Sequence, residues 1–446
     1  MSSTVTTTTA TRRGSARKVA VASFIGTAIE WYDFYLYGTA AALVFNRLFF
    51  PSFSPLAGTL LALSTYTAGF VARPLGGIVM GHFGDRLGRK SMLVLSLLMM
   101  GTATALIGVL PTFAVAGIWA PLLLVVLRVV QGFGVGGEWG GAVLMAVEHA
   151  PKRSRGFFGA WPQIGVPAGL LLANGVFMAL TNALGEKAFL QWGWRIPFLL
   201  SAVLVLVGLV IRLQVEESPA FQEVASSGRV DRRPFVTLLR TQWRVVLLAA
   251  GVKLAQNSIF YIFTVFVLTY ATSVLGLSQS VALTGVLISS ALSLGSLLFF
   301  GWLSDRYGRR RVYLVGAVVS VLFAFPFFWL LDTRSAVVIW LAMVIGMIGH
   351  DMMYGPQAAY FSELFDAKVR YSGASLGYQL SSLIAGGFAP VIAVALLGVA
   401  GGHHWPIATY MIVVGVISVV ALALAPETHR GDRRERADAS GRVDDT

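Results

Sequence analysis

Long apolar segments alternate with short polar stretches along the whole chain. Twelve apolar segments can be distinguished, and they are centred near residues 32, 68, 101, 132, 168, 204, 258, 290, 321, 349, 384 and 415. A helix that crosses a bilayer needs roughly 20 predominantly apolar residues, and each segment is long enough. The pattern therefore predicts an all-α integral membrane protein with twelve transmembrane helices.

One polar interruption divides the twelve segments into two sets of six. It runs from Val215 to Arg244, between the sixth and the seventh segments. We predict a polar tail over residues 1–18, a six-helix bundle over 19–214, a linker over 215–243, a second six-helix bundle over 244–426 and another tail over 427–446.

The composition supports this class and excludes several kinds of chemistry. Hydrophobic residues make up 56% of the chain and charged residues only 12%, whereas a soluble domain carries about 25% charged residues. The chain has no cysteine, which excludes disulfides, thiol catalysis and cysteine-ligated metals. The only two histidines at ligand spacing, His403 and His404, lie in a loop. We therefore expect no metal and no cofactor.

Basic residues gather in alternate loops and predict the orientation in the membrane. They cluster before segment 1, after segments 2, 4, 8 and 10, in the linker and near the C-terminal end. Cytoplasmic loops are enriched in Lys and Arg, so we expect both termini to be cytoplasmic in a multi-pass protein of the inner (plasma) membrane. This asymmetry accounts for most of the formal charge of +13, which therefore does not indicate nucleic-acid binding. The basic N-terminal stretch is interpreted as a tail rather than a signal peptide.

A motif after segment 2 recurs after segment 8. The first copy, GHFGDRLGRK, begins at Gly81, and the second, GWLSDRYGRRR, begins at Gly301, 220 residues downstream. A glutamate also precedes an arginine by seven positions after segment 4 and again after segment 10. The two halves are thus parallel repeats, as in transporters whose bundles are related by an axis along the membrane normal.

These motifs resemble those of a known family of transporters. The repeated loop is similar to the signature loop of the major facilitator superfamily. The strings EWYDF in segment 1, FVARPLGG in segment 2 and LRVVQGFGVGGEWGGA in segment 4 resemble its metabolite:proton symporter branch, which includes carriers of shikimate, 2-oxoglutarate, citrate and proline or betaine. The resemblance implies two pseudo-symmetric six-helix bundles, with segments 1, 4, 7 and 10 lining a central cavity.

The repeated loops are expected to act as gates. Gly81 and Gly88 permit a close helix approach and a tight turn. Asp85 can cap the positive N-terminus of a neighbouring helix, and Arg89 can pair with an acid such as Glu148. The simpler alternative is that these loops only fix the topology by their positive charge. The predicted gating residues are Gly81, Asp85, Arg86, Gly88, Arg89, Glu148, Arg155, Asp305, Arg306, Arg309, Glu363 and Arg370.

Several ionisable residues fall at membrane depth, where each needs a partner or a water-filled cavity. Glu30, Asp33 and Tyr37 lie on one stripe of segment 1, and Arg128 shares a stripe of segment 4 with Gln131. Segments 7 and 10 each show one polar face as well. The predicted substrate-binding residues are Tyr37, Arg128, Gln131, Lys253, Gln256, Asn257, Tyr261, His350 and Gln357.

The acids of this set are candidates for carrying protons. Burial favours the neutral form of a carboxyl group and a nearby arginine favours the charged form, so a change in either can move a proton. The predicted coupling residues are Glu30, Asp33 and Glu138. The structural alternative for the first two is a permanent ion pair with Arg128 or Arg73, and Glu138 is equally compatible with a packing pair to another segment.

The favoured function is proton-driven uptake of a small organic acid by rocking of the two bundles around a midplane site. Arg128 and Lys253 would supply positive charge for a carboxylate. A proline or betaine symporter is the nearest rival and would need an acid within an aromatic cage. A membrane enzyme lacks a nucleophile–base or metal constellation here. The expected partners are a small metabolite, protons and the lipid bilayer, with a monomer as the working unit.

Overall fold

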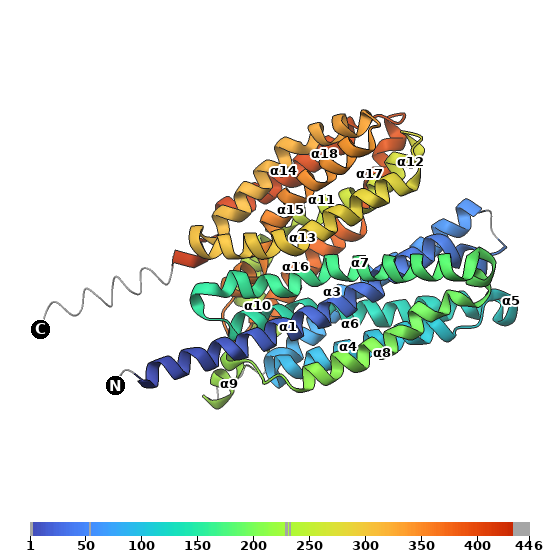
Figure 1. Ribbon diagram of the computed structural model, residues 1–446. Helices are drawn as coiled ribbons and strands as arrows, with labels where there is room; N and C mark the ends of the chain where they lie inside the picture. The colour runs from blue at the N-terminus through green and yellow to red at the C-terminus, as the bar shows by residue number, and fades with distance from the viewer. Residues whose placement is uncertain (1–2, 53–54, 228–230, 232, 431–446) are drawn as a thin grey trace, which may run out of the picture.

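The computed structural model describes residues 3–52, 55–227, 231 and 233–430 (Figure 1), and every regular element within them is a helix. The N-terminal bundle consists of α1 (Ser3–Ala40), η1 (Ala41–Phe45), α2 (Asn46–Leu48), α3 (Pro55–Leu87), α4 (Arg89–Val109), α5 (Phe113–Ala116), α6 (Trp119–His149), η2 (Lys152–Ser154), α7 (Arg155–Ala188), η3 (Phe189–Gly193) and α8 (Arg195–Leu213). Two short helices, α9 (Pro219–Ser226) and α10 (Pro234–Thr241), lie between the bundles in sequence.

The C-terminal bundle repeats this order of long helices. It consists of α11 (Trp243–Tyr261), η4 (Ile262–Phe266), α12 (Val267–Ser273), α13 (Gln279–Tyr307), α14 (Arg309–Asp332), α15 (Ala336–Leu364), α16 (Arg370–Ser381), η5 (Ser382–Gly387), α17 (Ala389–Val399), α18 (Trp405–Leu424) and η6 (Thr428–Arg430). Ten helical stretches of the described residues are long and apolar enough to cross a membrane. Helices α1 and α3 carry the first two apolar segments, so the predicted twelve-helix fold is confirmed. The predicted domain limits stay predictions.

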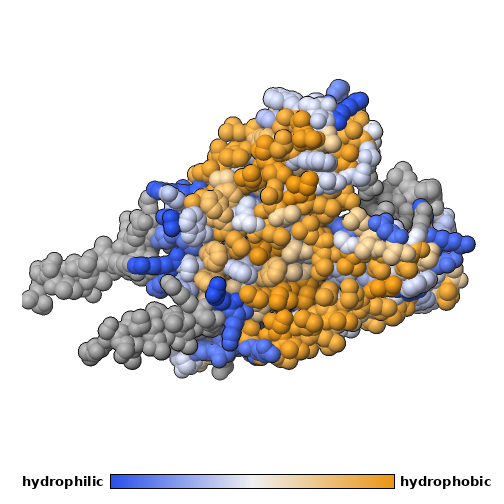
Figure 2. Space-filling view, in the orientation of Figure 1, coloured by the Kyte–Doolittle hydropathy of each residue, from blue (hydrophilic) through white to orange (hydrophobic). Residues whose placement is uncertain are grey.

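The surface carries a broad apolar belt with polar residues at its ends (Figure 2). Large apolar side chains are exposed along the belt, for example Leu206 at 62% and Leu322 at 71%. A soluble protein rarely exposes so large a continuous apolar surface. The belt is therefore the surface that faces the lipid of the bilayer, as expected for a multi-pass membrane protein.

The two repeated loops turn at equivalent glycines. Gly88 separates α3 from α4 with a φ of 106°, and Gly308 separates α13 from α14 with a φ of 103°. Backbone in this left-handed region is strained for any residue with a Cβ atom. The glycine spacing of the sequence repeat thus corresponds to a repeated sharp turn between antiparallel helices.

The two bundles contact each other mainly where α3 and α6 meet α16 and where α7 meets α13 and α15. We call the side on which α1 begins and α18 ends the terminal side, and the opposite side the distal side. The bundles lie close together on the terminal side and splay apart toward the distal side (Figure 1). A cavity of about 530 Å³ opens between them near the distal ends of α1, α7 and α13, where Arg47, Asn174 and Leu287 are among its lining residues. The described conformation is therefore closed on the terminal side.

Candidate functional site: contacts and buried charges between two bundles

Asp85 joins the two bundles on the terminal side. Its carboxylate accepts hydrogen bonds from the backbone N–H groups of Tyr371 and Ser372, at 3.2 and 2.9 Å, and from the Ser372 hydroxyl at 2.8 Å. These residues open α16, whose N-terminus carries a partial positive charge that attracts an anion. A Cβ atom added at Gly81 would lie 2.9 Å from the Cα of Ser372. The helix that Asp85 caps therefore belongs to the opposite bundle, and Gly81 permits its close approach.

Asp305 makes the reciprocal contact from the second copy of the motif. Its two carboxylate oxygens accept hydrogen bonds from the backbone N–H groups of Gly156 and Phe157, both at 2.8 Å, at the start of α7. Arg309 donates to the same carboxylate at 2.6 Å. Each bundle thus supplies one aspartate that caps one helix of the other bundle.

Two glutamates that the sequence reasoning missed support the repeated turns. Glu217, which follows α8, accepts hydrogen bonds from the backbone N–H groups of Arg89 and Lys90 at 3.1 Å each. Glu427, which follows α18, accepts one from the backbone N–H of Arg309 at 3.0 Å. Each of these carboxylates caps the helix that follows the turn, α4 or α14. The recurrence of a glutamate followed by a hydroxyl residue after segments 6 and 12 was the signal that could have found them.

Those hydroxyl residues connect the caps to a second layer of acids. The Ser218 hydroxyl donates to Glu148, and the Thr428 hydroxyl donates to Glu363 at 2.6 Å. The ion pairs follow the same repeat. Arg89 lies 3.6 Å from Glu148, Arg309 lies 3.5 Å from Glu363, and Arg370 crosses from the C-terminal bundle to lie 3.1 Å from Glu148.

Three of the predicted gating residues lie outside this network. Arg86 and Arg306 are exposed, and Arg306 lies over the ring of Trp302 at 4.1 Å. Arg155 is half-buried, and the ion pairs of the described residues do not include a counterpart of the Arg370–Glu148 contact between Arg155 and Glu363. The terminal closure is therefore asymmetric in its ion pairs, although it is symmetric in its helix caps.

Two arginines of the N-terminal bundle share an aromatic cluster at membrane depth. The Arg73 guanidinium lies 4.5 Å from the ring centre of Phe34 and 4.3 Å from that of Phe70. The Arg128 guanidinium lies 5.1 Å from the Phe34 ring and 4.3 Å from the Tyr37 ring. Aromatic faces attract cations, so these rings hold the two guanidinium groups near each other despite their equal charges.

The C-terminal bundle brings a third cation to the same interior. Lys253 is fully buried, with its Nζ atom 3.9 Å from the ring centre of Tyr378 and 3.3 Å from the Ser382 hydroxyl. The charge of Arg73 acts on both Lys253 and Tyr261, which lie across the bundle interface. The predicted polar face of segment 7 therefore meets the aromatic cluster of the N-terminal bundle. Within that face, the side-chain amide of Asn257 lies 3.4 Å from the backbone carbonyl of Ser381.

Asp33 connects to Arg128 through two intermediate side chains. Arg128 donates to the Gln131 amide oxygen at 3.1 Å, the Gln131 amide donates to the Thr104 hydroxyl at 2.6 Å, and this hydroxyl donates to Asp33 at 2.9 Å. The other oxygen of Asp33 accepts a hydrogen bond from Ser201 at 2.7 Å. Asp33 thus faces α4 and α8, and it reaches Arg128 only through a chain of polar side chains.

Glu138 lies in a separate place, inside the N-terminal bundle. It forms an ion pair with Arg212 of α8 and accepts a hydrogen bond from the Ser96 hydroxyl at 2.8 Å. Of the two readings that the sequence left open, this geometry matches a packing pair with another segment. Arg212 had not been recognised as a functional candidate, because it falls at the end of an apolar segment whose partners cannot be read from periodicity.

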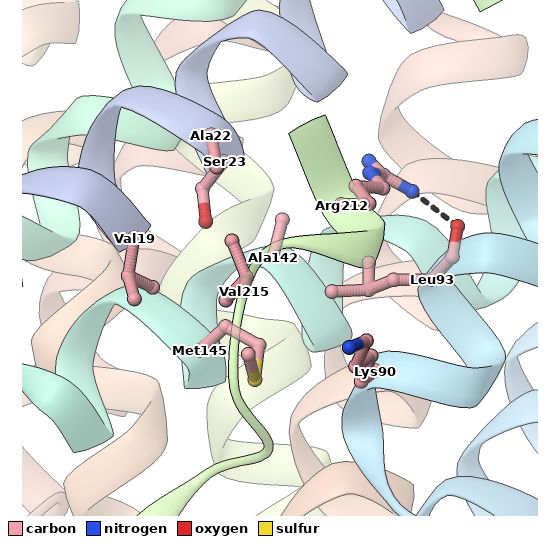
Figure 3. A pocket seen from close by; sticks show the side chains of 9 residues that line it. All are labelled: Val19, Ala22, Ser23, Lys90, Leu93, Ala142, Met145, Arg212 and Val215. Carbon is pink, nitrogen blue, oxygen red and sulfur yellow. Dashed lines mark hydrogen bonds between the residues drawn. The ribbon is translucent and has the colours of Figure 1, made fainter. Parts of the chain in front are cut away.

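Glu30 is a third buried acid of the N-terminal bundle, and both this ion pair and Arg73 act on it. Its side chain is buried, and its Oε2 atom has no hydrogen-bond partner in the described part of the chain. Arg73 and Arg212 attract its charge, whereas Glu138 and Asp33 repel it. A small pocket of about 20 Å³ lies beside Arg212, and Ser23 of α1 and Lys90 of α4 also line it (Figure 3). The pocket is large enough for about one water molecule.

The remaining predicted residues face different neighbours. The Tyr37 hydroxyl shares a hydrogen bond with Thr65, and Gln256 contacts His350 at 2.7 Å. Gln357 accepts a hydrogen bond from Tyr313 of α14 at 3.1 Å. Gln357 therefore points into its own bundle, whereas Gln256 and His350 join α11 to α15.

Comparison with known proteins decides the family. A family model described as the Major Facilitator Superfamily matches residues 23–386 of the chain. The chain belongs to the major facilitator superfamily. This superfamily member is therefore a membrane transporter, as its repeated loops indicated.

The relatives of this superfamily member are named for different substrates. The shikimate transporter of Escherichia coli (strain K12) is 45% identical over 418 residues, which cover 93% of this chain and 95% of that protein. The proline/betaine transporter of the same strain is 34% identical over 427 residues, covering 93% and 84%. Among solved structures, the proton:xylose symporter XylE bound to 6-bromo-6-deoxy-D-glucose has a TM-score of 0.76 at 20% identity, covering 94% of this chain and 97% of that chain.

The asymmetry of the terminal ion pairs generates a prediction. The Arg370→Gln substitution removes the ion pair with Glu148 that joins the bundles. A partly exposed ion pair stabilises the closed state by about 1 kcal/mol. We therefore expect the terminal side to open about fivefold more often. Arg155→Gln is the matched control and should change opening by less than about twofold, since no cross-bundle pair is lost. The measurement is the maleimide labelling rate of a single Ser375→Cys reporter, which lies buried between the bundles. Equal acceleration by both variants would contradict the asymmetry.

The buried Glu138–Arg212 pair generates a second prediction. Removing one partner of a buried ion pair costs about 3–5 kcal/mol, because the other charge is left uncompensated, whereas an apolar replacement of both is tolerated much better. We expect Arg212→Met and Glu138→Leu each to lower the midpoint of thermal unfolding in detergent, and the double variant to recover part of the loss. Arg86→Met, on an exposed arginine, is the control and should change little. A double variant as unstable as the sum of the singles would show that the two residues act independently.

Proposed function

We propose that this transporter is a proton-coupled symporter that imports a small organic acid by alternating access. The observation that carries the proposal is the set of three cationic side chains, Arg73, Arg128 and Lys253, that both bundles direct into one buried interior. Buried cations are costly unless an anion or an oriented polar group compensates them. A carboxylate substrate entering from the distal side would supply that negative charge, and an arginine can hold it through two parallel hydrogen bonds.

The same groups favour an anion over a quaternary ammonium substrate. A betaine-type cation is held by aromatic faces and an acid. Here the faces of Phe34, Phe70 and Tyr378 already hold cations of the protein itself. The quaternary ammonium group of such a substrate would be repelled here by Arg73, Arg128 and Lys253. An osmolyte symporter remains the second candidate, because relatives named proline/betaine transporters are 34% identical.

Asp33 is the proposed proton carrier, and the polar chain to Arg128 gives it a route to sense the substrate. When a substrate carboxylate engages Arg128, it competes with the Gln131 amide oxygen for the guanidinium N–H groups. Loss of the Arg128–Gln131 hydrogen bond frees Gln131 to turn, which changes the hydrogen bond that Thr104 donates to Asp33. Substrate binding and the protonation of Asp33 are thereby linked.

Release to the cell interior would follow opening of the terminal side. The caps made by Asp85 and Asp305 must separate, and α3 and α7 then move away from α16 and α13 as rigid bodies. We propose that the terminal side is cytoplasmic, in agreement with the basic residues of its loops. Glu30 and the water-sized pocket beside Arg212 offer a second place for protons to equilibrate with that side.

Transport in proteoliposomes tests this function. With the outside more acidic than the inside, the wild type should accumulate radiolabelled shikimate above equilibrium and should not accumulate glycine betaine. Asp33→Asn should abolish accumulation but retain shikimate exchange, because the site stays intact while the proton is lost. Arg128→Gln should weaken shikimate binding at least about tenfold, for a charge-assisted hydrogen bond of about 1.5–3 kcal/mol.

The control for this experiment is Asp332→Asn, which removes a carboxylate that lies 40% exposed near the distal surface. Accumulation by this variant should equal that of the wild type. Accumulation of glycine betaine without shikimate would overturn the organic-acid proposal in favour of the osmolyte one. Accumulation of either compound that is independent of the pH gradient would overturn the proton coupling.

A further inference from the structure

A histidine–aspartate pair lies buried in the C-terminal bundle, at a place that the proposed function does not use. The Nδ1 atom of His350 lies 2.9 Å from one carboxylate oxygen of Asp351. The other oxygen of Asp351 accepts hydrogen bonds from Ser296 and, at 2.8 Å, from Ser293, both on α13. The side chains of His350 and Asp351 are only 3% and 2% exposed. Both acceptor oxygens of this acid are therefore satisfied by hydrogen-bond donors.

Gln256 of α11 completes the cluster. Its amide nitrogen lies 2.7 Å from the Nε2 atom of His350. In this orientation of the amide its nitrogen donates and Nε2 accepts, so the ring carries its proton on Nδ1, facing Asp351. The amide oxygen of Gln256 has no hydrogen-bond partner among the described atoms. An amide turned by half a rotation would present this oxygen to Nε2 instead.

That rotation would let the ring accept a proton without leaving any of its N–H groups unpaired. A proton from water would bind to Nε2, the new N–H would donate to the turned Gln256 oxygen, and Nδ1–H would keep its bond to Asp351. The cationic ring would then sit beside a carboxylate, which stabilises it in a medium of low dielectric constant. One side-chain rotation thus separates two fully hydrogen-bonded states of the ring.

A water-sized cavity reaches this pair from the interface between the bundles. It has a volume of about 10 Å³, which is close to the minimum for one water molecule. His350 and Asp351 line it from the C-terminal bundle, and Tyr35 of α1 and Leu170 of α7 line it from the N-terminal bundle. Because both bundles form its walls, its contact with bulk water changes when the bundles rock.

Among the described residues, no charged side chain other than those of the pair lines the cavity. The titratable groups that line the cavity are Tyr35 of α1 and Tyr354 of α15, while α7 and α13 contribute apolar and serine side chains and α11 contributes Phe260. On α11, Lys253 lies one turn before Gln256. Glu30 acts electrostatically on Tyr354, which lines the cavity. On the far side of α15, Tyr313 of α14 is engaged by Gln357.

We propose that His350 and Asp351 form a further proton-binding site, in the C-terminal bundle and distinct from Asp33 and Glu30, whose occupancy Gln256 communicates to the polar face of α11. The communication is direct, because Gln256 lies on the same helix as Lys253 and Asn257, and its amide turns when the ring gains a proton. The inference rests on the proposed function for its role in transport. The proton binding itself does not depend on the identity of the substrate.

Nitrogen-15 NMR of histidine-labelled, full-length protein in detergent tests the proton binding. The chain has six histidines, and the His350 signal is assigned by its loss in His350→Gln or by removal of the other five. As the pH is lowered, we expect this signal to change from that of a neutral ring to that of a doubly protonated ring, and Asp351→Asn to move the pH at which it changes. Gln256→Met, which leaves the pair intact, should also move it. A His350 ring that keeps one protonation state throughout, or a midpoint that neither variant changes, overturns the proposal.

The pH profile of shikimate exchange in proteoliposomes tests the coupling. His350→Gln and Gln256→Met should change the profile. The matched control is His404→Gln, since His404 lies 3.2 Å from Asp332 in a second histidine–aspartate pair near the distal surface; it should leave the profile unchanged. Titration of His350 with unaltered exchange profiles in both variants overturns the coupling. If shikimate is not transported at all, the proposed function fails while the NMR titration still decides the proton site.

Discussion

The closure of this transporter depends on carboxylates that bind helix N-termini of the opposite bundle. Asp85 and Asp305 are each held by two backbone N–H groups and by an arginine of their own loop. A buried carboxylate without such donors would cost several kcal/mol. When the bundles part, water replaces those donors, so both states satisfy the charges. The free-energy difference between them can therefore be small, which is what a protein that alternates between two conformations needs.

The buried cations at membrane depth are compensated less fully than these carboxylates. Arg73, Arg128 and Lys253 are placed on aromatic faces and hydroxyl groups. These partners hold a cation in place but neutralise it only in part. The interior therefore keeps a positive potential, which is the basis for the proposed organic-acid substrate. In that proposal Asp33, at the end of the chain through Gln131 and Thr104, responds when the anion binds.

The sequence predicted the fold and singled out Asp85 and Asp305, which join the bundles on the terminal side, because both depend on patterns within one segment or on a repeat. Apolar length marked the helices, and the repeated loops marked Asp85 and its counterpart. The partners of the buried acids could not be predicted in the same way. Thr104 and Ser201 bind Asp33 from helices far away in sequence, and a single hydroxyl in an apolar helix carries no periodic signal. Arg212 was missed for the same reason, because only the packed structure shows that it faces Glu138.

Pulsed electron paramagnetic resonance on the terminal side tests whether the reciprocal caps hold the bundles together. Spin labels introduced by Arg153→Cys and Arg306→Cys report across the interface, since these exposed positions lie on opposite bundles and the chain has no other cysteine. If the caps hold the bundles together, the labelled protein with both aspartates should show one population of short distances. Combining Asp85→Asn with Asp305→Asn should add a second population at longer distances. A distance distribution that stays the same after both carboxylates are removed would contradict the account.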